Sequence, residues 1–352
     1  MLNNVFDILV SIKYPLIGLF FSFIALSFYW TPIFKFFKLK SYDNVQRVHK
    51  SEVSRLGGLI IYFFLWTIYL NGFHENNLFF YILTSAFPII VVNLKEDLHH
   101  NTSPLIRLFS MLISCLIFFY LYPIDLPEID IPLIGQFISS YPLAIIFFTF
   151  SIIVVMNGMN LIDGMNGLFG FTATMQMILV AFIALKFNDI ALFNTSIIFT
   201  LPLIFFLFFN FPLGKIFIGD LGAYLYGFII SILIIYLFGK HQELLSWLAV
   251  LILFYPCMEL LFSYTRKVKN RHSPFDADSK HLHTLINSKL KKIFNNSLQS
   301  NNICTLSLFV FWLTPFFFCK FIPINFKSII FTIILLVMLY LLFYRLAMKS
   351  IK

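Results

Sequence analysis

The stretch NGMNLIDGMNG, from Asn157 to Gly167, lies between two segments that are almost wholly apolar. Asn160, Asp163 and Asn166 are spaced i, i+3, i+6, which predicts that they share one face at the end of a membrane helix. A carboxylate beside a bilayer is costly to desolvate unless a cation, a ligand or water compensates its charge. We therefore interpret this stretch as a candidate functional site. A polar helix end with an Asn and Gly turn is the alternative.

The composition excludes an ordinary soluble domain. Charged residues make up 12% of the 352 residues and hydrophobic residues 60%, whereas about 25% of residues are charged in soluble domains. Windows of about 20 apolar residues predict an all-α, polytopic integral membrane protein with eleven transmembrane helices in one domain over residues 1–352. The predicted spans are 15–34, 57–73, 77–94, 105–123, 138–156, 168–186, 191–211, 221–239, 244–264, 303–321 and 327–347.

The basic residues predict the orientation of these spans. With eleven spans, the odd-numbered loops and the C-terminus share one side, and they carry 20 of the 25 Lys and Arg residues. The positive-inside rule then places that side and the C-terminus in the cytoplasm and the N-terminus outside. The formal net charge of +9 reflects this sorting, so we predict no nucleic-acid partner.

Polar clusters occupy the predicted cytoplasmic loops. Basic side chains in the first loop suit a phosphate at the headgroup surface, although an ordinary positive-inside anchor is the alternative. The glycine pair that follows, Gly57 and Gly58, lets a helix start close to another backbone or a ligand. The basic residues of interest in this loop are Arg47, His49, Lys50 and Arg55.

Carboxylates stand at the ends of other predicted spans. Glu96 and Asp97 are adjacent at the end of the third span, and Asp220 opens the eighth. Adjacent carboxylates repel each other, so a divalent cation or a phosphate-handling role would compensate them. A solvated turn for the pair and a helix cap for Asp220 are the alternatives.

The ninth predicted span and its loop contain Glu259, Arg271, His281 and His283. Histidines at i and i+2 do not share a helix face, which argues against a preformed zinc pair and favours donors to a diphosphate or its leaving group. Glu259 is a membrane-embedded acid, for which we expect a Lys or Arg partner from this loop. The sequence LHTLINSKLKKIF predicts an amphipathic segment in the same loop.

The acidic residues as a set favour an enzyme. Nine of the 16 fall on the predicted cytoplasmic side, including every one that lies in a polar motif at a span end. A transporter would place ionisable groups near the midplane of several helices. Convergence on one interface fits an enzyme that joins a water-soluble charged substrate to a membrane lipid.

Taken in this order, NGMNLIDGMNGL, KIFIGDLGA and SPFDADSKHLH resemble the motifs of the polyprenyl-phosphate N-acetylhexosamine-1-phosphate transferases, which form glycosyltransferase family 4. The resemblance covers roughly residues 45–285 and leaves the predicted helices of 303–347 peripheral. SPFDADSKHLH, with the upstream PCME, is more similar to undecaprenyl-phosphate GlcNAc-1-phosphate transferase than to phospho-MurNAc-pentapeptide transferase.

The resemblance implies a multi-pass enzyme of the bacterial plasma membrane with its active site on the cytoplasmic face. The implied reaction uses Mg²⁺, with Mn²⁺ as an alternative ion, to transfer a HexNAc-1-phosphate from a UDP-HexNAc to undecaprenyl phosphate and release UMP. Such a reaction is the first membrane step of O-antigen, capsule or teichoic-acid type polysaccharide synthesis. Contact with membrane lipids and a homodimer are further expectations.

The motifs and the polar loops together give the predicted site. Asp97 with Glu96 would orient or deprotonate the lipid phosphate for direct attack, and a phospho-Asp97 intermediate is the alternative. The predicted catalytic residues are Asp97, Glu96, Asp163, His281 and His283; the substrate-binding residues are Arg47, His49, Lys50, Asn157, Asn160, Asn166 and Arg271; the metal ligands are Asp220 and Asp163.

Three positions depart from the family pattern. Glu96 replaces an Asp, Asn166 replaces the second Asp of NxxDGxDGL, and Thr284 replaces the last His of HxHH. The first departure keeps a carboxylate, and the second removes one potential metal or base group. The last two motivate the alternative function, which is a catalytically inactive family member that acts as a membrane carrier or scaffold.

Overall fold

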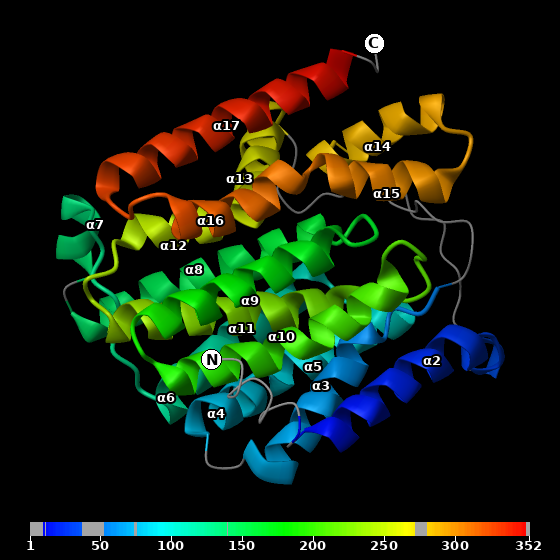
Figure 1. The fold of residues 1–352 in the computed structure, drawn as a ribbon, viewed down its shortest axis with the longest axis horizontal. Coiled ribbons are helices and arrows are strands. Elements are labelled where there is room, and N and C mark those ends of the chain that lie inside the picture. Colours follow the sequence, from blue (N-terminus) through cyan, green and yellow to red (C-terminus); the bar gives the residue numbers. More distant parts are fainter. Residues whose placement is uncertain are drawn as a thin grey trace.

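The computed structural model describes residues 10, 12–36, 53–73, 76–138, 140–271 and 280–349. Regular structure in these ranges is helical (Figure 1), apart from one isolated parallel bridge between Ser54 and Ile216. In chain order the helices are α2 (Lys13–Phe36), α3 (Gly57–Ile68) continuing into η1 (Tyr69–Phe73), α4 (Asn77–Ser85), α5 (Phe87–His99), α6 (Pro104–Leu121), α7 (Pro132–Phe137), α8 (Tyr141–Ile162), α9 (Leu168–Lys186), α10 (Ile190–Asn210), α11 (Gly219–Lys240), α12 (Ser246–Ile252), α13 (Phe254–Lys269), α14 (Leu282–Ile293), α15 (Ser297–Ser307), α16 (Phe309–Phe321) and α17 (Phe326–Lys349).

Within the described ranges, the number of candidate membrane spans is seven to nine. Seven segments are long and apolar enough by themselves, and two bent pairs raise the number to nine: α4 with α5, at 43°, and α12 with α13, at 80°. The predicted spans 15–34 and 57–73 overlap α2 and α3 with η1, which are not counted among these nine. The protein is therefore an all-helical polytopic membrane protein over its described ranges, while the eleven-span count and the orientation stay predictions.

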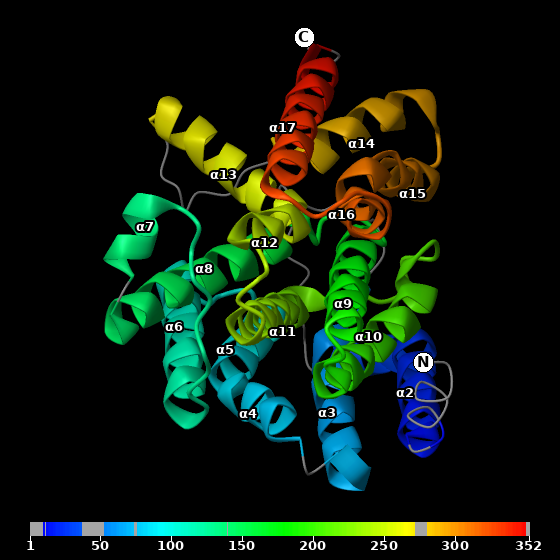
Figure 2. The same ribbon diagram turned by 60° about the vertical axis from the view of Figure 1, so that its left-hand side comes forward.

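Helix α11 lies at the centre of the bundle (Figure 2) and packs against α3, α5, α8 and α9. Its apolar window is 94% buried, compared with 22% for α17. A 22-residue helix is about 33 Å long, close to the thickness of a bilayer core of about 30 Å. The two ends of α11 therefore lie near opposite edges of the apolar layer.

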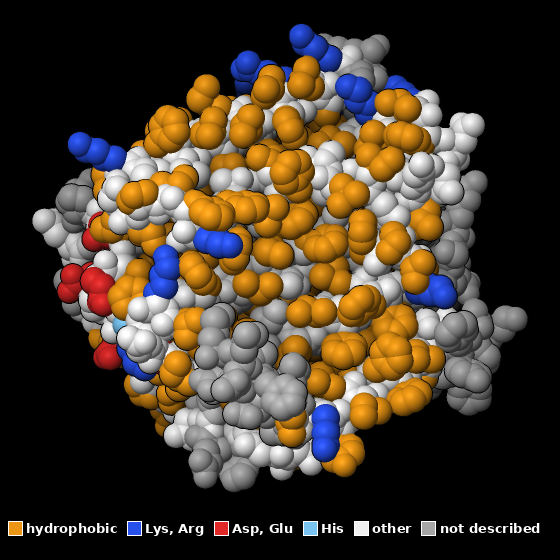
Figure 3. Space-filling model, in the orientation of Figure 1, with side chains coloured by type: hydrophobic (Ala, Val, Ile, Leu, Met, Phe, Trp, Pro, Cys, Tyr) orange, Lys and Arg blue, Asp and Glu red, His pale blue; other side chains and the backbone are white. Residues whose placement is uncertain are grey.

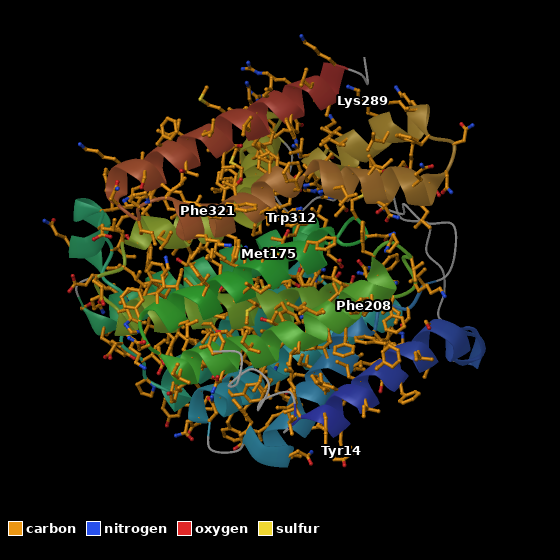
Figure 4. The ribbon with its side chains drawn as sticks, in the orientation of Figure 1. Tyr14, Met175, Phe208, Lys289, Trp312 and Phe321 are labelled. Carbon is orange, nitrogen blue, oxygen red and sulfur yellow. The ribbon has the colours of Figure 1, made fainter. Side chains whose placement is uncertain are left out.

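The exterior is apolar where a membrane would contact it. Hydrophobic side chains cover most of one face of the molecule, and Lys and Arg lie mainly toward its margins (Figure 3). Tyr14 of α2, Phe208 of α10 and Phe321 of α16 are 74%, 65% and 65% exposed, and all three are visible on this side (Figure 4). Such exposure is unfavourable in water and suits lipid contact.

Candidate active site

Two arginines hold Asp220 in the first turn of α11. Nη2 of Arg55, which precedes α3, donates to Oδ1 of Asp220 at 2.6 Å, and Nη1 of Arg107 in α6 donates to Oδ2 at 2.8 Å. Nε of Arg55 also lies 3.4 Å from Oδ1 of Asp97 in α5. Segments before α3, in α5, in α6 and at the start of α11 therefore meet at one end of the bundle.

Asp97 caps the N-terminus of α11. Its Oδ1 accepts a hydrogen bond from the backbone N–H of Asp220 at 2.9 Å, and its Oδ2 accepts one from that of Leu221 at 3.0 Å. These N–H groups have no partner within the helix, and a carboxylate there also interacts favourably with the helix dipole. The side chain that caps α11 is thus Asp97 rather than Asp220.

Gly219 makes this approach feasible. Its φ is +75°, a left-handed conformation that favours glycine. A Cβ at this position would overlap the carboxylate of Asp97 and the carbonyl oxygen of Arg55. The glycine of the KIFIGDLGA motif is therefore required by the contact between the two acidic motifs.

The Arg55 guanidinium interacts electrostatically with four carboxylates. Although burial disfavours its charge, they hold the pKa of Arg55 above its usual value. Burial raises the pKa of Asp163 well above the usual range; Arg55 lowers it, and the charges of Asp220 and Asp97 raise it further. The four acids are Asp220, Asp97, Asp163 and Glu96. The structure therefore brings together the acids that the sequence places far apart.

The shared helix face predicted for Asn160, Asp163 and Asn166 is wrong. Helix α8 ends at Ile162, and Gly167, with φ +79°, precedes α9. Beyond this break Asn166 turns toward α15: its N–H donates to Oδ1 of Asn301 at 2.8 Å, and its carbonyl accepts from Oγ1 of Thr305 at 2.7 Å. Only 1% of Asn166 is exposed, so the residue anchors the loop rather than facing the acids.

The other two asparagines of this stretch are on α8. Nδ2 of Asn157 donates to the carbonyl of Ile153 at 2.8 Å and lies 3.6 Å from Sδ of Met111. The backbone carbonyl of Asn160 accepts from the N–H of Asp163 at 3.2 Å. Their substrate-binding roles remain predictions, since neither amide is joined to the carboxylates by a hydrogen bond in the part of the chain that the structure describes.

The two histidines lie at the start of α14. Their rings are parallel, with an interplanar angle of 4° and centroids 5.6 Å apart. A Cβ on Gly164 would lie 2.5 Å from Nε2 of His283, so this ring packs directly on the loop next to Asp163. Burial lowers the pKa of His283 to about 4. The charge of Glu259 opposes this shift and that of His281 adds to it. His283 is therefore neutral at pH 7.

Among the described residues, the expectation of a Lys or Arg partner for Glu259 is wrong, because other donors hold the carboxylate. Its partners are His281, the backbone of Leu282 and Tyr340 of α17. Sequence reasoning does not find Tyr340, which lies in an apolar helix without a motif. It also assigns no role toward Asp220 to Arg55 or Arg107, although both stand beside motif residues.

The remaining predicted residues are Arg271 and three basic residues of the first loop. Arg47, His49 and Lys50 fall outside the residues that the structure describes. Arg271 is exposed after the end of α13, and no hydrogen bond or ion pair joins it to the carboxylates across residues 53–271 as described.

Carboxylates are the type of ligand that a hard cation prefers, but the present arrangement of the described acids does not form a metal site. Within the described ranges, no three His, Cys, Asp or Glu side chains are placed to hold a metal ion together. Both oxygens of Asp220 are taken by the two arginines. The side-chain carboxylate of Asp163, in contrast, has no hydrogen bond or ion pair to another described residue, and the neighbouring acids repel its charge. Carboxylate oxygens are ligands that Mg²⁺ prefers, so Asp163 with Asp220 fits such an ion.

Comparisons with known proteins find similarity over the part of the chain that carries the three aspartates. A sequence profile of glycosyl transferase family 4 matches residues 79–238, which contain Asp97, Asp163 and Asp220. A probable undecaprenyl-phosphate N-acetylglucosaminyl 1-phosphate transferase of Bacillus subtilis (strain 168) is 26% identical over 72% of this chain and 72% of its own length.

Two further relatives extend the comparison. An undecaprenyl-phosphate alpha-N-acetylglucosaminyl 1-phosphate transferase of Thermotoga maritima is 24% identical over 76% of this chain and 80% of its own length. A phospho-N-acetylmuramoyl-pentapeptide-transferase of Dictyoglomus thermophilum is 30% identical, but over 57% of this chain and 64% of its own length. The family profile and these relatives agree in assigning residues 79–238 of the chain to glycosyl transferase family 4.

Proposed function

We propose that the chain transfers a HexNAc-1-phosphate of the GlcNAc type from a UDP-sugar to undecaprenyl phosphate and releases UMP. The observation that carries the proposal is the meeting of Arg55, Arg107, Asp97 and Asp220 at one end of an apolar bundle, in a family 4 chain. Charged groups at the edge of an apolar layer suit a reaction between a soluble diphosphate and a lipid phosphate. The proposed place is the cytoplasmic face of a bacterial plasma membrane, as the first membrane step of a cell-surface polysaccharide.

Arg55 and Arg107 are the proposed phosphate-binding groups. Guanidinium groups bind phosphate oxygens in pairs, and phosphoryl transfer depends mainly on positioning and charge stabilisation. Both side chains are partly exposed, at 35% and 21%, so a substrate phosphate has access to them. His281 and His283 are proposed to contact the diphosphate.

The two adjacent acids have different proposed roles. Both oxygens of Asp97 already accept backbone hydrogen bonds, which favours a positioning role for Asp97 and the one-step route over a phospho-Asp97 intermediate. Glu96 accepts one hydrogen bond on Oε2, from the N–H of Thr102 at 2.8 Å. Its second oxygen is therefore the group that we assign to orienting or deprotonating the lipid phosphate.

Asp163 and Asp220 are the proposed ligands of Mg²⁺, or of Mn²⁺ in its place. When bound, such an ion neutralises charge on the diphosphate and on the departing UMP. Each oxygen of Asp220 accepts from one arginine and keeps a second lone pair, so Asp220 would contribute an oxygen either beside an arginine or after releasing one. A substrate phosphate that binds Arg55 or Arg107 would favour this release.

The alternative function is an inactive carrier or scaffold, and the position of Asn166 argues against it. Because Asn166 is buried against α15, its substitution for Asp removes no carboxylate from the group around Arg55. Thr284 follows His283 on α14 and leaves both described histidines in place.

The experiment is UMP release by purified protein supplied with undecaprenyl phosphate and a panel of UDP-HexNAc donors. We expect release with at least one donor, and abolition of release by a chelator of divalent ions. Asp220→Asn should lower turnover by about 10²–10³-fold, as when one charge-stabilising group of an active site is removed. Asp189→Asn is the matched control, because this buried carboxylate pairs with Lys240 at the other end of α11. No release with any donor would support the carrier, and normal turnover of Asp220→Asn would refute the metal assignment.

A further inference from the structure

Glu259 is a buried carboxylate with three donors. Its Oε1 lies 3.1 Å from Nδ1 of His281 and accepts from the N–H of Leu282 at 2.9 Å, while its Oε2 accepts from the hydroxyl of Tyr340 at 2.9 Å. Only 1% of Glu259 is exposed. Burying a carboxylate in a helix bundle is costly, and none of these donors is a Lys or Arg that would repay it as a fixed ion pair. The arrangement therefore points to a purpose beyond stability.

The carboxylate selects the tautomer of His281. A carboxylate only accepts hydrogen bonds, so the imidazole nitrogen facing it, Nδ1, has to carry a proton. In the neutral ring Nε2 is then the unprotonated nitrogen, and in the charged ring Nε2 is a donor. Glu259 thus determines which nitrogen of His281 is left for chemistry.

The same oxygen also fixes where α14 begins. His281 is the N-cap of α14, and Leu282, whose N–H is bound by Glu259, is its first residue. The helix start carries His283 two residues later, packed on Gly164 beside Asp163. One side chain of α13 therefore sets both the orientation of His281 and the position of the histidine pair against the acid-bearing loop.

Tyr340 extends this arrangement to α17. Its ring is fully buried and packs on Phe262 at 5.3 Å and Phe311 at 5.9 Å between ring centroids. This aromatic packing fixes the position of the hydroxyl. This contact links the last helix, which lies beyond the profile match to residues 79–238, to the start of α14.

We propose that Glu259 is a positioning residue that holds His281 in the Nδ1-protonated tautomer with Nε2 presented to the reacting phosphates, and that Tyr340 holds Glu259. The catalytic meaning of this arrangement rests on the proposed function, whereas the tautomer itself does not. Removal of a carboxylate that orients a metal-bound imidazole typically lowers activity by about 10- to 100-fold, and we expect an effect of the same order here.

The kinetic test is a double-mutant cycle in the UMP-release assay. We expect Glu259→Gln to lower kcat by about 10- to 100-fold, because the amide can donate to Nδ1 and favour the other tautomer. We expect the double variant Glu259→Gln/His281→Asn to be no slower than His281→Asn alone within about threefold, since coupled residues are not additive. Tyr340→Phe should lower kcat by less than Glu259→Gln does, because it leaves the contact with His281 intact.

Two matched controls separate positioning from loss of stability. Asp189→Asn removes a buried carboxylate, and Tyr226→Phe removes a buried hydroxyl that donates to the carbonyl of Phe199 at 3.0 Å. Each should combine additively with His281→Asn. Additive behaviour of Glu259→Gln as well would overturn the positioning role.

A second measurement does not depend on turnover. In the ¹⁵N spectrum of histidine-labelled protein, the signals absent from His281→Asn belong to His281 and report its protonated nitrogen. We expect protonated Nδ1 in the wild type and loss of that form in Glu259→Gln. Protonation at Nε2 alone in the wild type would overturn the inference, while absence of UMP release with the expected ¹⁵N spectrum would count against the proposed function only.

Discussion

Oδ1 of Asp97 accepts a hydrogen bond from the backbone N–H of Asp220 at 2.9 Å, so one acidic motif caps the helix that carries the next. The contact joins residues 123 positions apart in the chain. The two motifs are therefore coupled through the backbone, and the side chain of Asp97 acts on the site through the placement of Asp220.

The first prediction concerns Asp97→Asn. Asn keeps one acceptor oxygen, so it can bind one of the two N–H groups at the start of α11 and cannot pair ionically with Arg55. We expect the free energy of unfolding to fall by about 1–2 kcal/mol and UMP release to fall about tenfold. Thermal unfolding in detergent and the release assay check both effects.

The control for this cap is Asn76→Ala. Oδ1 of Asn76 accepts from the N–H of Phe79 at 2.9 Å and caps α4, 21 residues before Asp97. It should cost similar stability and leave UMP release near that of the wild type. Equal activity losses in the two variants would show that the loss at Asp97 reflects stability rather than placement of Asp220.

The second prediction concerns Asn166→Asp, which restores the family residue. Nδ2 of Asn166 lies 3.4 Å from Oδ1 of Asn302, and a carboxylate at this 1% exposed position would face an acceptor without a donor. We expect a loss of about 1–3 kcal/mol in stability and no gain in UMP release. The exposed Asn295→Asp is the matched control and should change neither quantity. A clear increase in turnover of Asn166→Asp would mean that the residue acts in the site.

The third prediction concerns pH. Burial lowers the pKa of His283 to about 4, while Glu259 of α13 favours the charged ring and His281 opposes it. Between pH 6.5 and about 4 the unfolded chain binds a proton at this residue and the folded chain does not, so stability falls as pH falls through this window. The contribution of His283 to this fall amounts to at most about 3 kcal/mol.

The measurement is the thermal unfolding of wild type and His283→Gln across this pH range. We expect the wild type to lose more stability than His283→Gln on acidification. The difference between the two proteins excludes the contribution of the other titrating groups. The exposed His99→Gln should follow the wild type. Identical slopes for wild type and His283→Gln would contradict the buried neutral state.

Local sequence predicts the helices well because apolar runs of bilayer length have few other solutions. Each of the eleven predicted spans overlaps a helix or a consecutive pair. The predicted single span 244–264 nevertheless breaks by 80° between α12 and α13, at Leu253. Window hydropathy does not register such a break, because the residues on both sides of it are apolar. The prediction that LHTLINSKLKKIF contains an amphipathic segment is confirmed by α14.

The sequence predicts those residues of the candidate site that belong to recognisable motifs. Sequence reasoning selects Asp97, Asp163 and Asp220, and in the structure all three interact electrostatically with the Arg55 guanidinium. It does not predict that Asn166 binds Asn301, 135 residues later, because that contact depends on how α15 docks. Long-range partners of single polar side chains are set by tertiary packing, which local periodicity does not encode.

The last prediction concerns the glycine pair at the start of α3, which was expected to allow close approach to another backbone. The N–H of Gly58 donates to the carbonyl of Ile218 at 2.9 Å, and a Cβ on Gly58 would overlap the backbone of Gly222 in α11. Gly58→Ala gains up to about 1 kcal/mol of helix propensity, but overpacking costs about 1–3 kcal/mol and pushes α3 from α11. Since Arg55 lies three residues earlier, we expect its hold on Asp220 to weaken and UMP release to fall about tenfold or more. Gly18→Ala in α2 meets nothing within 4 Å and should keep both stability and release, so a loss in Gly58→Ala alone, measured by thermal unfolding and UMP release, identifies the contact between α3 and α11 as its cause.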